Sequence, residues 1–194
     1  VRVYEYFGQS WSLPLWDDRL IHFFSKLPAD LKYKKYLYDY TIVGHGRNED
    51  YTGESLCIAY RKEVELLGLE HFWLSPTPHV PGSRYEIQSE YPRICPCALL
   101  KHKDIKTPIK VYNVHLDHIS DEARILGIKQ IVEKIEAESV IQSFPTMIMG
   151  DFNAYPDSET ITFCKTYEKY KLIDLSENSG MTFHNFNGSG IDKK

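Results

Sequence analysis

The sequence predicts a single α+β domain in which strands outnumber helices. Short runs rich in β-branched and aromatic residues recur along the chain, and each ends at a turn signal. Amphipathic helices are few and follow the strands in mixed order, which favours a layered α+β domain over a doubly wound α/β fold. Of the 194 residues, 42% are hydrophobic and 26% charged, as in an ordinary globular domain. No repeat, low-complexity tract or linker divides the chain.

Six runs carry the strand pattern. They span residues 38–46, 55–61, 64–74, 93–102, 109–117 and 146–151. The loop between the third and fourth runs, residues 75–92, holds four of the ten prolines. Loops of this length without secondary structure are uncommon and are often functional. Two interpretations stay open: a surface crossover between two sheets, and a loop that gates access of a substrate.

One helix has a clear start at Ser120, a natural N-cap residue followed by two acids that oppose the helix dipole. An apolar stripe at helical spacing then follows, comprising Ile125, Ile128, Ile131, Val132 and Ile135. A second helix is predicted over residues 158–170 and a shorter one near residues 30–38.

Charge and composition exclude several classes of function. The formal net charge of −4 disfavours a protein that coats nucleic acid, which normally presents a basic face. It does not exclude an enzyme that meets phosphate through a metal ion, because the cation reverses the local sign. No apolar run is long enough to span a membrane, and the start of the chain lacks the order of a signal peptide, so a cytoplasmic protein is expected.

The four cysteines are predicted to be buried free thiols. Cys95 and Cys97 form a CxC pair that could indicate metal or redox chemistry, but no second pair completes a zinc site.

Polar residues end two of the predicted strands. Because side chains alternate across a strand, one face of residues 109–117 begins apolar and ends with Asn113, His115 and Asp117. One face of residues 146–153 likewise ends with Asp151 and Asn153. If the strands are neighbours, an imidazole, a carboxylate and an amide gather at one rim, as a hydrolytic site requires. The alternatives are a surface histidine and a turn in which the aspartate binds its own backbone.

Motifs in this order resemble the endonuclease/exonuclease/phosphatase superfamily of DNase I-like hydrolases, and in particular its small bacterial-type members. The similarity spans roughly Leu27 to the C-terminus. Its motifs are Gly53-Glu54, Phe72-Trp73-Leu74-Ser75, Pro92-Arg93, the NVHLDH run from Asn113 to His118, Gly150-Asp151-Phe152-Asn153 and Thr182-Phe183.

The resemblance implies a four-layered α/β sandwich that hydrolyses phosphoesters of small molecules or nucleic acids with Mg²⁺ or Mn²⁺. It implies that Asp151 binds metal and orients or deprotonates the attacking water, and that Asn153 holds a phosphate oxygen. His115 would contact the phosphate or help protonate the leaving group. Glu54 would hydrogen-bond His115 and raise its pKa towards neutrality.

Two further residues receive roles from the resemblance. Arg93 would contact the substrate phosphate, although a structural salt bridge is an equal alternative. Asp174 would orient a second histidine near the C-terminus.

The expected Gln-Glu metal-ligand strand and the closing Asp-His pair are not found. The domain is therefore expected to be incomplete at both ends, with residues 1–26 a divergent or truncated segment and 27–194 a partial domain. The leading hypothesis is a metal-dependent phosphoester hydrolase that carries part of its site. The alternative is an inactive relative that binds a phosphorylated ligand or protein partner. A nucleic-acid-binding module is disfavoured by the acidic charge, and the oligomeric state stays open.

Overall fold

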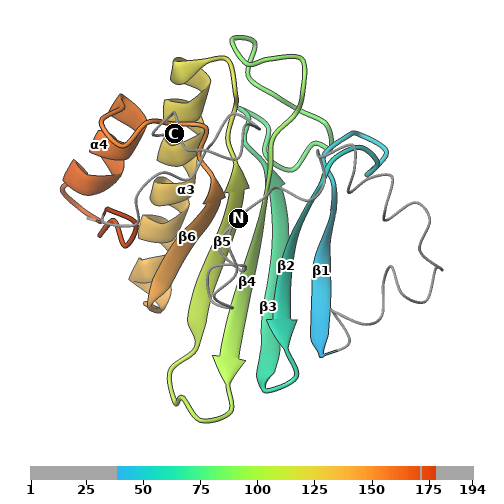
Figure 1. The fold of residues 1–194 in the computed structure, drawn as a ribbon, viewed down its shortest axis with the longest axis vertical. Coiled ribbons are helices and arrows are strands. Elements are labelled where there is room, and N and C mark those ends of the chain that lie inside the picture. Colours follow the sequence, from blue (N-terminus) through green and yellow to red (C-terminus); the bar gives the residue numbers. More distant parts are fainter. Residues whose placement is uncertain (1–38, 171, 178–194) are drawn as a thin grey trace, which may run out of the picture.

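A computed structural model describes residues 39–170 and 172–177 as two β-sheets and two α-helices (Figure 1). The predicted helix near residues 30–38 and the predicted boundary between residues 26 and 27 lie outside the described residues. The elements are β1 (Tyr40–Gly46), β2 (Ser55–Arg61), β3 (Val64–Trp73), β4 (Ile94–His102), β5 (Ile109–His115), α3 (Asp121–Ile141), β6 (Thr146–Asp151) and α4 (Glu159–Thr166). All six predicted strands are present, with ends shifted by two residues at most.

The strands form an antiparallel pair, β1–β2, and a four-stranded sheet in the order β3-β4-β5-β6. Within the larger sheet, β3 to β5 pair antiparallel, whereas β5 and β6 pair parallel, with α3 as the connection between them. The carboxyl ends of β5 and β6 therefore meet at one edge of the sheet, which is the upper edge in Figure 1. Because β4 runs opposite to β5, its first residues lie at the same edge.

Both faces of the four-stranded sheet are covered. On one face, side chains of β3, β4 and β5 pack against α3 and α4 around the fully buried Tyr112 and Ile128. On the other face, Ala98 and Val111 pack against Ile58 of β2. The side-chain amide of Asn113 donates to the backbone oxygen of Cys57 at 2.8 Å and so joins the two sheets directly. The predicted α+β class is confirmed, and the described residues supply a helix layer and two sheet layers.

Both described helices begin where the sequence indicates. The Ser120 hydroxyl accepts from the backbone N–H of Ala123 at 3.1 Å, and the Ser158 hydroxyl accepts from Ile161 in the same way. The second helix ends at Thr166, four residues earlier than predicted, because the chain turns back and Leu172 donates to the carbonyl of Cys164. Among the described residues, no helix has both the length and the hydropathy that crossing a membrane requires.

The long loop at residues 75–92 joins β3 to β4, which are antiparallel neighbours in one sheet. The interpretation of this loop as a crossover between sheets is therefore wrong. Its side chains instead anchor it to the middle of α3, where the Tyr85 hydroxyl donates to Gln130, and to the segment before α3, where Ser89 donates to Asp117.

The four cysteines are free thiols, as predicted, and all but Cys57 are buried. Burial raises the pKa of the Cys97 thiol to about 11, so this group stays protonated and inert near neutral pH.

Candidate functional site

The candidate site lies at the sheet edge where β5 and β6 end. The parallel register places His115 beside Asp151, and Nε2 of the imidazole lies 3.9 Å from Oδ2 of the carboxylate. The two polar strand ends that the alternation pattern indicated are thus direct neighbours. The predicted gathering of imidazole, carboxylate and amide at one rim is present in the structure.

Gly150 allows β6 to approach β5 closely just before the site. Its φ of +126° is one that side-chain-bearing residues rarely adopt, and a Cβ there would lie 1.9 Å from the carbonyl oxygen of Val114. Only glycine fits this position. The close approach sets the direction in which the chain leaves the sheet with Asp151.

The residues after Gly150 form a tight turn. Oδ1 of Asp151 accepts from the backbone N–H of Asn153 at 2.8 Å, which is the self-bonded turn considered from the sequence. Asn153 itself has a φ of +47°, and its side-chain amide donates to the carbonyl of Leu116 at 3.0 Å. One N–H of the Asn153 amide is thereby committed to the end of β5. The turn and the rim location coexist, because Oδ2 of Asp151 still faces His115.

Glu54, directly before β2, reaches His115 from the smaller sheet. Its Oε1 lies 3.3 Å from Nδ1 of His115, which places it where the predicted pairing requires. Its Oε2 pairs with Nη1 of Arg47, a residue in the turn between β1 and β2. The two oxygens of one carboxylate therefore contact two different side chains of the site.

The expectation that Glu54 raises the pKa of His115 towards neutrality needs correction. Burial, the largest influence, lowers the pKa of His115 below its usual 6.5. Glu54 and Asp151 do raise it, but Arg93 and Arg47 oppose them, and the net shift is downward. His115 is therefore neutral near pH 7, with one ring nitrogen as a donor and the other as an acceptor.

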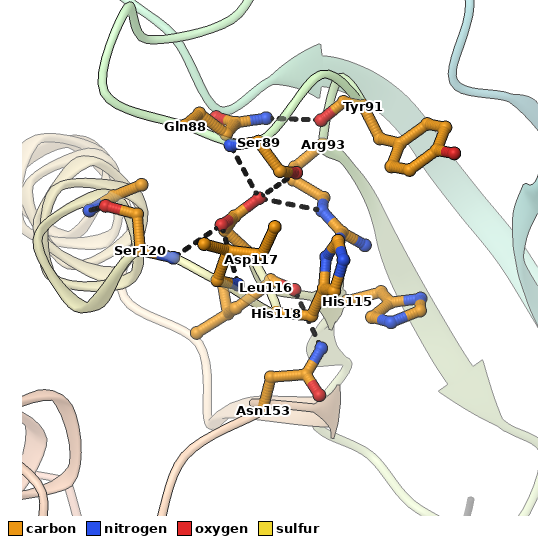
Figure 2. A network of polar contacts seen from close by, with 12 residues as sticks. Gln88, Ser89, Tyr91, Arg93, His115, Leu116, Asp117, His118, Ser120 and Asn153 are labelled. Atoms are coloured by element: carbon orange, nitrogen blue, oxygen red, sulfur yellow. Dashed lines mark hydrogen bonds and ion pairs between the residues drawn. The ribbon is translucent and has the colours of Figure 1, made fainter.

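Arg93, two residues before the buried Cys95, is almost completely buried, with 3% of its surface exposed. Its Nε lies 3.7 Å from Oδ2 of Asp117, and its Nη2 donates to Nδ1 of His118 at 2.8 Å (Figure 2). Within the described residues, Nε and Nη1 have no hydrogen-bond acceptor. The structural ion pair is therefore present, yet it leaves buried donors unsatisfied, which is costly without a further acceptor.

Asp117, which the alternation pattern grouped with His115, acts as an anchor beneath the site. Its carboxylate accepts from the backbone and hydroxyl of Ser89 and from the backbone N–H groups of Ile119 and Ser120 (Figure 2). Burial alone would raise the pKa of Asp117, but these hydrogen bonds and the charge of Arg93 outweigh it and hold the pKa below 3.8.

A small hollow opens between the two sheets at the rim. Its lining consists of Arg47, Glu54, Leu56, Arg93, Ile94 and His115. Two guanidinium groups and an imidazole facing one hollow form a suitable environment for an anion such as phosphate. Sequence reasoning missed Arg47. The available signal was a basic residue in the turn that also presents Glu54.

Asp174 is not brought to this rim. Its Oδ1 accepts from the backbone and hydroxyl of Ser176 at 2.8 and 2.6 Å, and its Oδ2 lies 3.4 Å from Nζ of Lys165 on α4. Its predicted role in orienting a second histidine stays a prediction, because the histidine of the expected closing Asp-His pair is not found in the sequence.

For a metal ion, the described residues offer no cluster of three or more acidic, histidine or cysteine side chains. They do offer two carboxylates, Glu54 and Asp151, whose side chains are 44% and 49% exposed on either side of His115. Both oxygens of Glu54 are engaged by His115 and Arg47, whereas Asp151 is half exposed. Magnesium is commonly held by one or two carboxylates together with water and substrate phosphate, so Asp151 fits as one ligand of such an ion.

Comparison with known proteins gives matches among solved structures. No protein-family model and no curated protein matches the chain. An endonuclease/exonuclease/phosphatase family protein from Bacteroides thetaiotaomicron is 32% identical, with a TM-score of 0.60, over 66% of this chain and 46% of that one. A second from Bacteroides vulgatus is 28% identical, with a TM-score of 0.65, over 72% of this chain and 53% of that one.

A mannosyl-6-phosphatase from Bacteroides thetaiotaomicron is similar to the same degree. It is 32% identical with a TM-score of 0.61, and the match covers 66% of this chain and 48% of that one. The chain thus spans about half the length of these solved structures.

Proposed function

Because this chain belongs to the endonuclease/exonuclease/phosphatase superfamily, we propose that it hydrolyses a phosphoester by attack of water at the rim where β5 and β6 end. One observation carries the proposal. A neutral imidazole and a carboxylate face each other at 3.9 Å, next to a hollow that Arg47 and Arg93 line. A phosphate in that hollow would lie beside two guanidinium groups and two proton acceptors.

Glu54 sets the role of His115 by fixing its tautomer. Because Nδ1 lies 3.3 Å from a carboxylate oxygen, the tautomer with its proton on Nδ1 is the one that Glu54 favours. Nε2 is then an acceptor that faces Oδ2 of Asp151. Two acceptors do not bind each other directly, but a water molecule between them donates one proton to each. His115 and Asp151 thereby hold and orient the attacking water, and either can take its proton as the bond from the water oxygen to phosphorus forms. The bond from phosphorus to the leaving oxygen breaks in the same step, and the protonated side chain returns the proton to that oxygen.

The phosphate is held from the other side. Arg93, which lines the hollow, supplies a positive charge next to the phosphate. The second N–H of the Asn153 amide can serve a further phosphate oxygen, because only one is used by Leu116.

The charge of the site favours a divalent cation. With His115 neutral, three carboxylates and two guanidiniums are present, namely Glu54, Asp117, Asp151, Arg47 and Arg93. An anionic phosphate would therefore enter a region whose net charge is already negative. We propose that Asp151 binds Mg²⁺ or Mn²⁺. When bound, such an ion stabilises charge on phosphate oxygens and lowers the pKa of a coordinated water molecule.

The test is hydrolysis of bis-p-nitrophenyl phosphate, p-nitrophenyl phosphate and mannose 6-phosphate, each with Mg²⁺ or Mn²⁺. Mannose 6-phosphate is included because of the similarity to the mannosyl-6-phosphatase. Both this chain and a version extended through the C-terminal histidine should be measured. Asp151→Ala should abolish turnover while circular dichroism shows the fold intact. Asp157→Ala, which removes an exposed acid six residues further on, is the matched control. Full turnover by Asp151→Ala would refute the proposal.

A second candidate is an inactive relative that binds a phosphorylated ligand. It is favoured by the lack of a three-ligand metal cluster in residues 39–170 and 172–177. Phosphate binding without turnover in both the given and the extended chain would support it.

A further inference from the structure

We propose that Arg47 is a second guanidinium contact to the substrate phosphate and acts in the same hollow as Arg93. This inference rests on the proposed hydrolase function and deepens it by adding a substrate-binding residue from the smaller sheet. A hollow with cationic contacts from both sheets would enclose a terminal phosphate from two sides.

The backbone of Arg47 is held in place at both ends of the residue. Its N–H donates to the carbonyl of Glu54 at 3.2 Å, and its carbonyl accepts from the indole N–H of Trp73 at 2.7 Å. Trp73 is the last residue of β3 and is buried, with 4% of its surface exposed. These two hydrogen bonds fix the point at which the Arg47 side chain leaves the turn, next to the hollow that it lines.

The side chain is equally constrained. It is only 14% exposed, and its guanidinium carbon lies 4.6 Å from the centroid of the Tyr91 ring. Stacking on an aromatic face leaves the N–H groups at the edge of the guanidinium available for acceptors in its plane. One of them pairs with Glu54. Within the described residues, the Nε and Nη2 groups of Arg47 have no hydrogen bond, so donors remain for a phosphate oxygen.

The charges of Arg47 and Arg93 also favour an anion in this hollow. Burial lowers the pKa of Arg93, and the nearby charge of Arg47 lowers it further. Two guanidinium groups that repel each other and line one small hollow form an arrangement that an anion between them stabilises.

The inference is tested by titrating inorganic phosphate into the full chain by calorimetry, with and without Mg²⁺. Arg47→Ala should weaken phosphate binding by about 10- to 100-fold, the loss expected for a hydrogen bond between charged groups. Arg47→Lys keeps the charge but loses the fork geometry of the guanidinium, so its affinity for phosphate should lie between those of the parent and Arg47→Ala. Arg61→Ala is the matched control, because Arg61 also stacks on a tyrosine of the same two-stranded sheet, with its guanidinium carbon 5.5 Å from the Tyr40 ring centroid. It should bind phosphate like the parent.

A second readout uses the indole N–H of Trp73, which donates to the Arg47 carbonyl. Phosphate should shift its nuclear magnetic resonance signal in the parent and less in Arg47→Lys. The inference is overturned if the parent binds no phosphate, or if folded Arg47→Lys and Arg47→Ala bind it as the parent does. If Arg47→Ala does not fold, phosphate binding by Arg47→Lys alone decides whether the inference holds. Phosphate binding that depends on Arg47 but occurs without turnover would remove the hydrolase function and leave this inference standing.

Discussion

Replacing Asp117 by asparagine tests whether the carboxylate beneath the site stabilises it. The Asp117 side chain is only 1% exposed, and one of its oxygens accepts from Ser89 and lies 3.7 Å from Nε of Arg93. The asparagine oxygen can still serve the N–H groups of Ile119 and Ser120. The NH₂ group of the asparagine would then face the N–H and hydroxyl of Ser89 and the guanidinium of Arg93, so these buried donors would lose their acceptor.

The expected cost follows from this geometry. Removing one partner of a buried ion pair destabilises by about 3–5 kcal/mol, since the remaining charge stays buried. The lower end applies here, because Arg93 keeps a 2.8 Å hydrogen bond to His118. We expect Asp117→Asn to lower the free energy of unfolding by about 3 kcal/mol, a large share of the roughly 5–15 kcal/mol of a typical domain.

Urea unfolding followed by circular dichroism measures this change, provided that the m-value is the same in both proteins. Glu122→Gln, which removes an exposed charge from the first turn of α3, is the control and should cost at most about 1 kcal/mol. A change for Asp117→Asn no larger than that of the control would refute the reasoning.

The same variant has a defined pH dependence. Because the folded pKa of Asp117 is lowered below 3.8, its ionised form contributes stability at every pH above that value. This stability is lost as the pH falls through the folded pKa. The difference in unfolding free energy between parent and Asp117→Asn should therefore be constant above about pH 5 and shrink in more acidic solution. A difference that grew on acidification would contradict the lowered pKa.

Three further changes test other parts of the structure. Gly150→Ala introduces a Cβ at 1.9 Å from the Val114 carbonyl and at a φ of +126°, so it should cost at least about 1–3 kcal/mol in thermal or urea unfolding. Glu54→Gln removes a charge that raises the pKa of His115. Nuclear magnetic resonance titration of the metal-free protein should therefore show a lower pKa for His115 in the variant than in the parent. A higher pKa for His115 in the variant would contradict this. Ser120→Ala removes the cap of α3 and should lower the unfolding free energy by about 1 kcal/mol, whereas no loss would show that the Ser120 hydroxyl does not stabilise the start of the helix.

The parts of the fold that the sequence predicted depend on local physics. The start of α3 follows from the Ser120 hydroxyl, which acts on an N–H three residues away. The strands follow from alternation and turn residues, and each was located to within two residues. The end of α4 at Thr166 was not predicted, because it depends on a hydrogen bond between Leu172 and Cys164 that no local sequence pattern indicates.

The same distinction between local and long-range contacts decides which parts of the candidate site could be predicted. His115 and Asp151 could be placed together from sequence, because each ends a strand and alternation fixes which face it occupies. The contact of Glu54 with His115 was expected only from the family resemblance, since it joins residues of different sheets. Arg47 was not foreseen, because its contacts with the site arise only once the β1–β2 pair packs on the larger sheet. The contact between Arg93 and His118 was not foreseen, because it joins segments that flank β4 and β5 and lie 25 residues apart in the sequence.

The hydrogen bond from Asn113 to the Cys57 carbonyl has a consequence for thermal inactivation. His115 and Arg93 belong to one sheet, whereas Glu54 and Arg47 belong to the other. A slide of about one ångström between the sheets would separate these pairs while both sheets keep their own ladders. On warming, phosphate binding should therefore be lost at a lower temperature than the circular dichroism signal of the folded protein. Mutations that strengthen the packing between the two sheets should bring these two transition temperatures closer together.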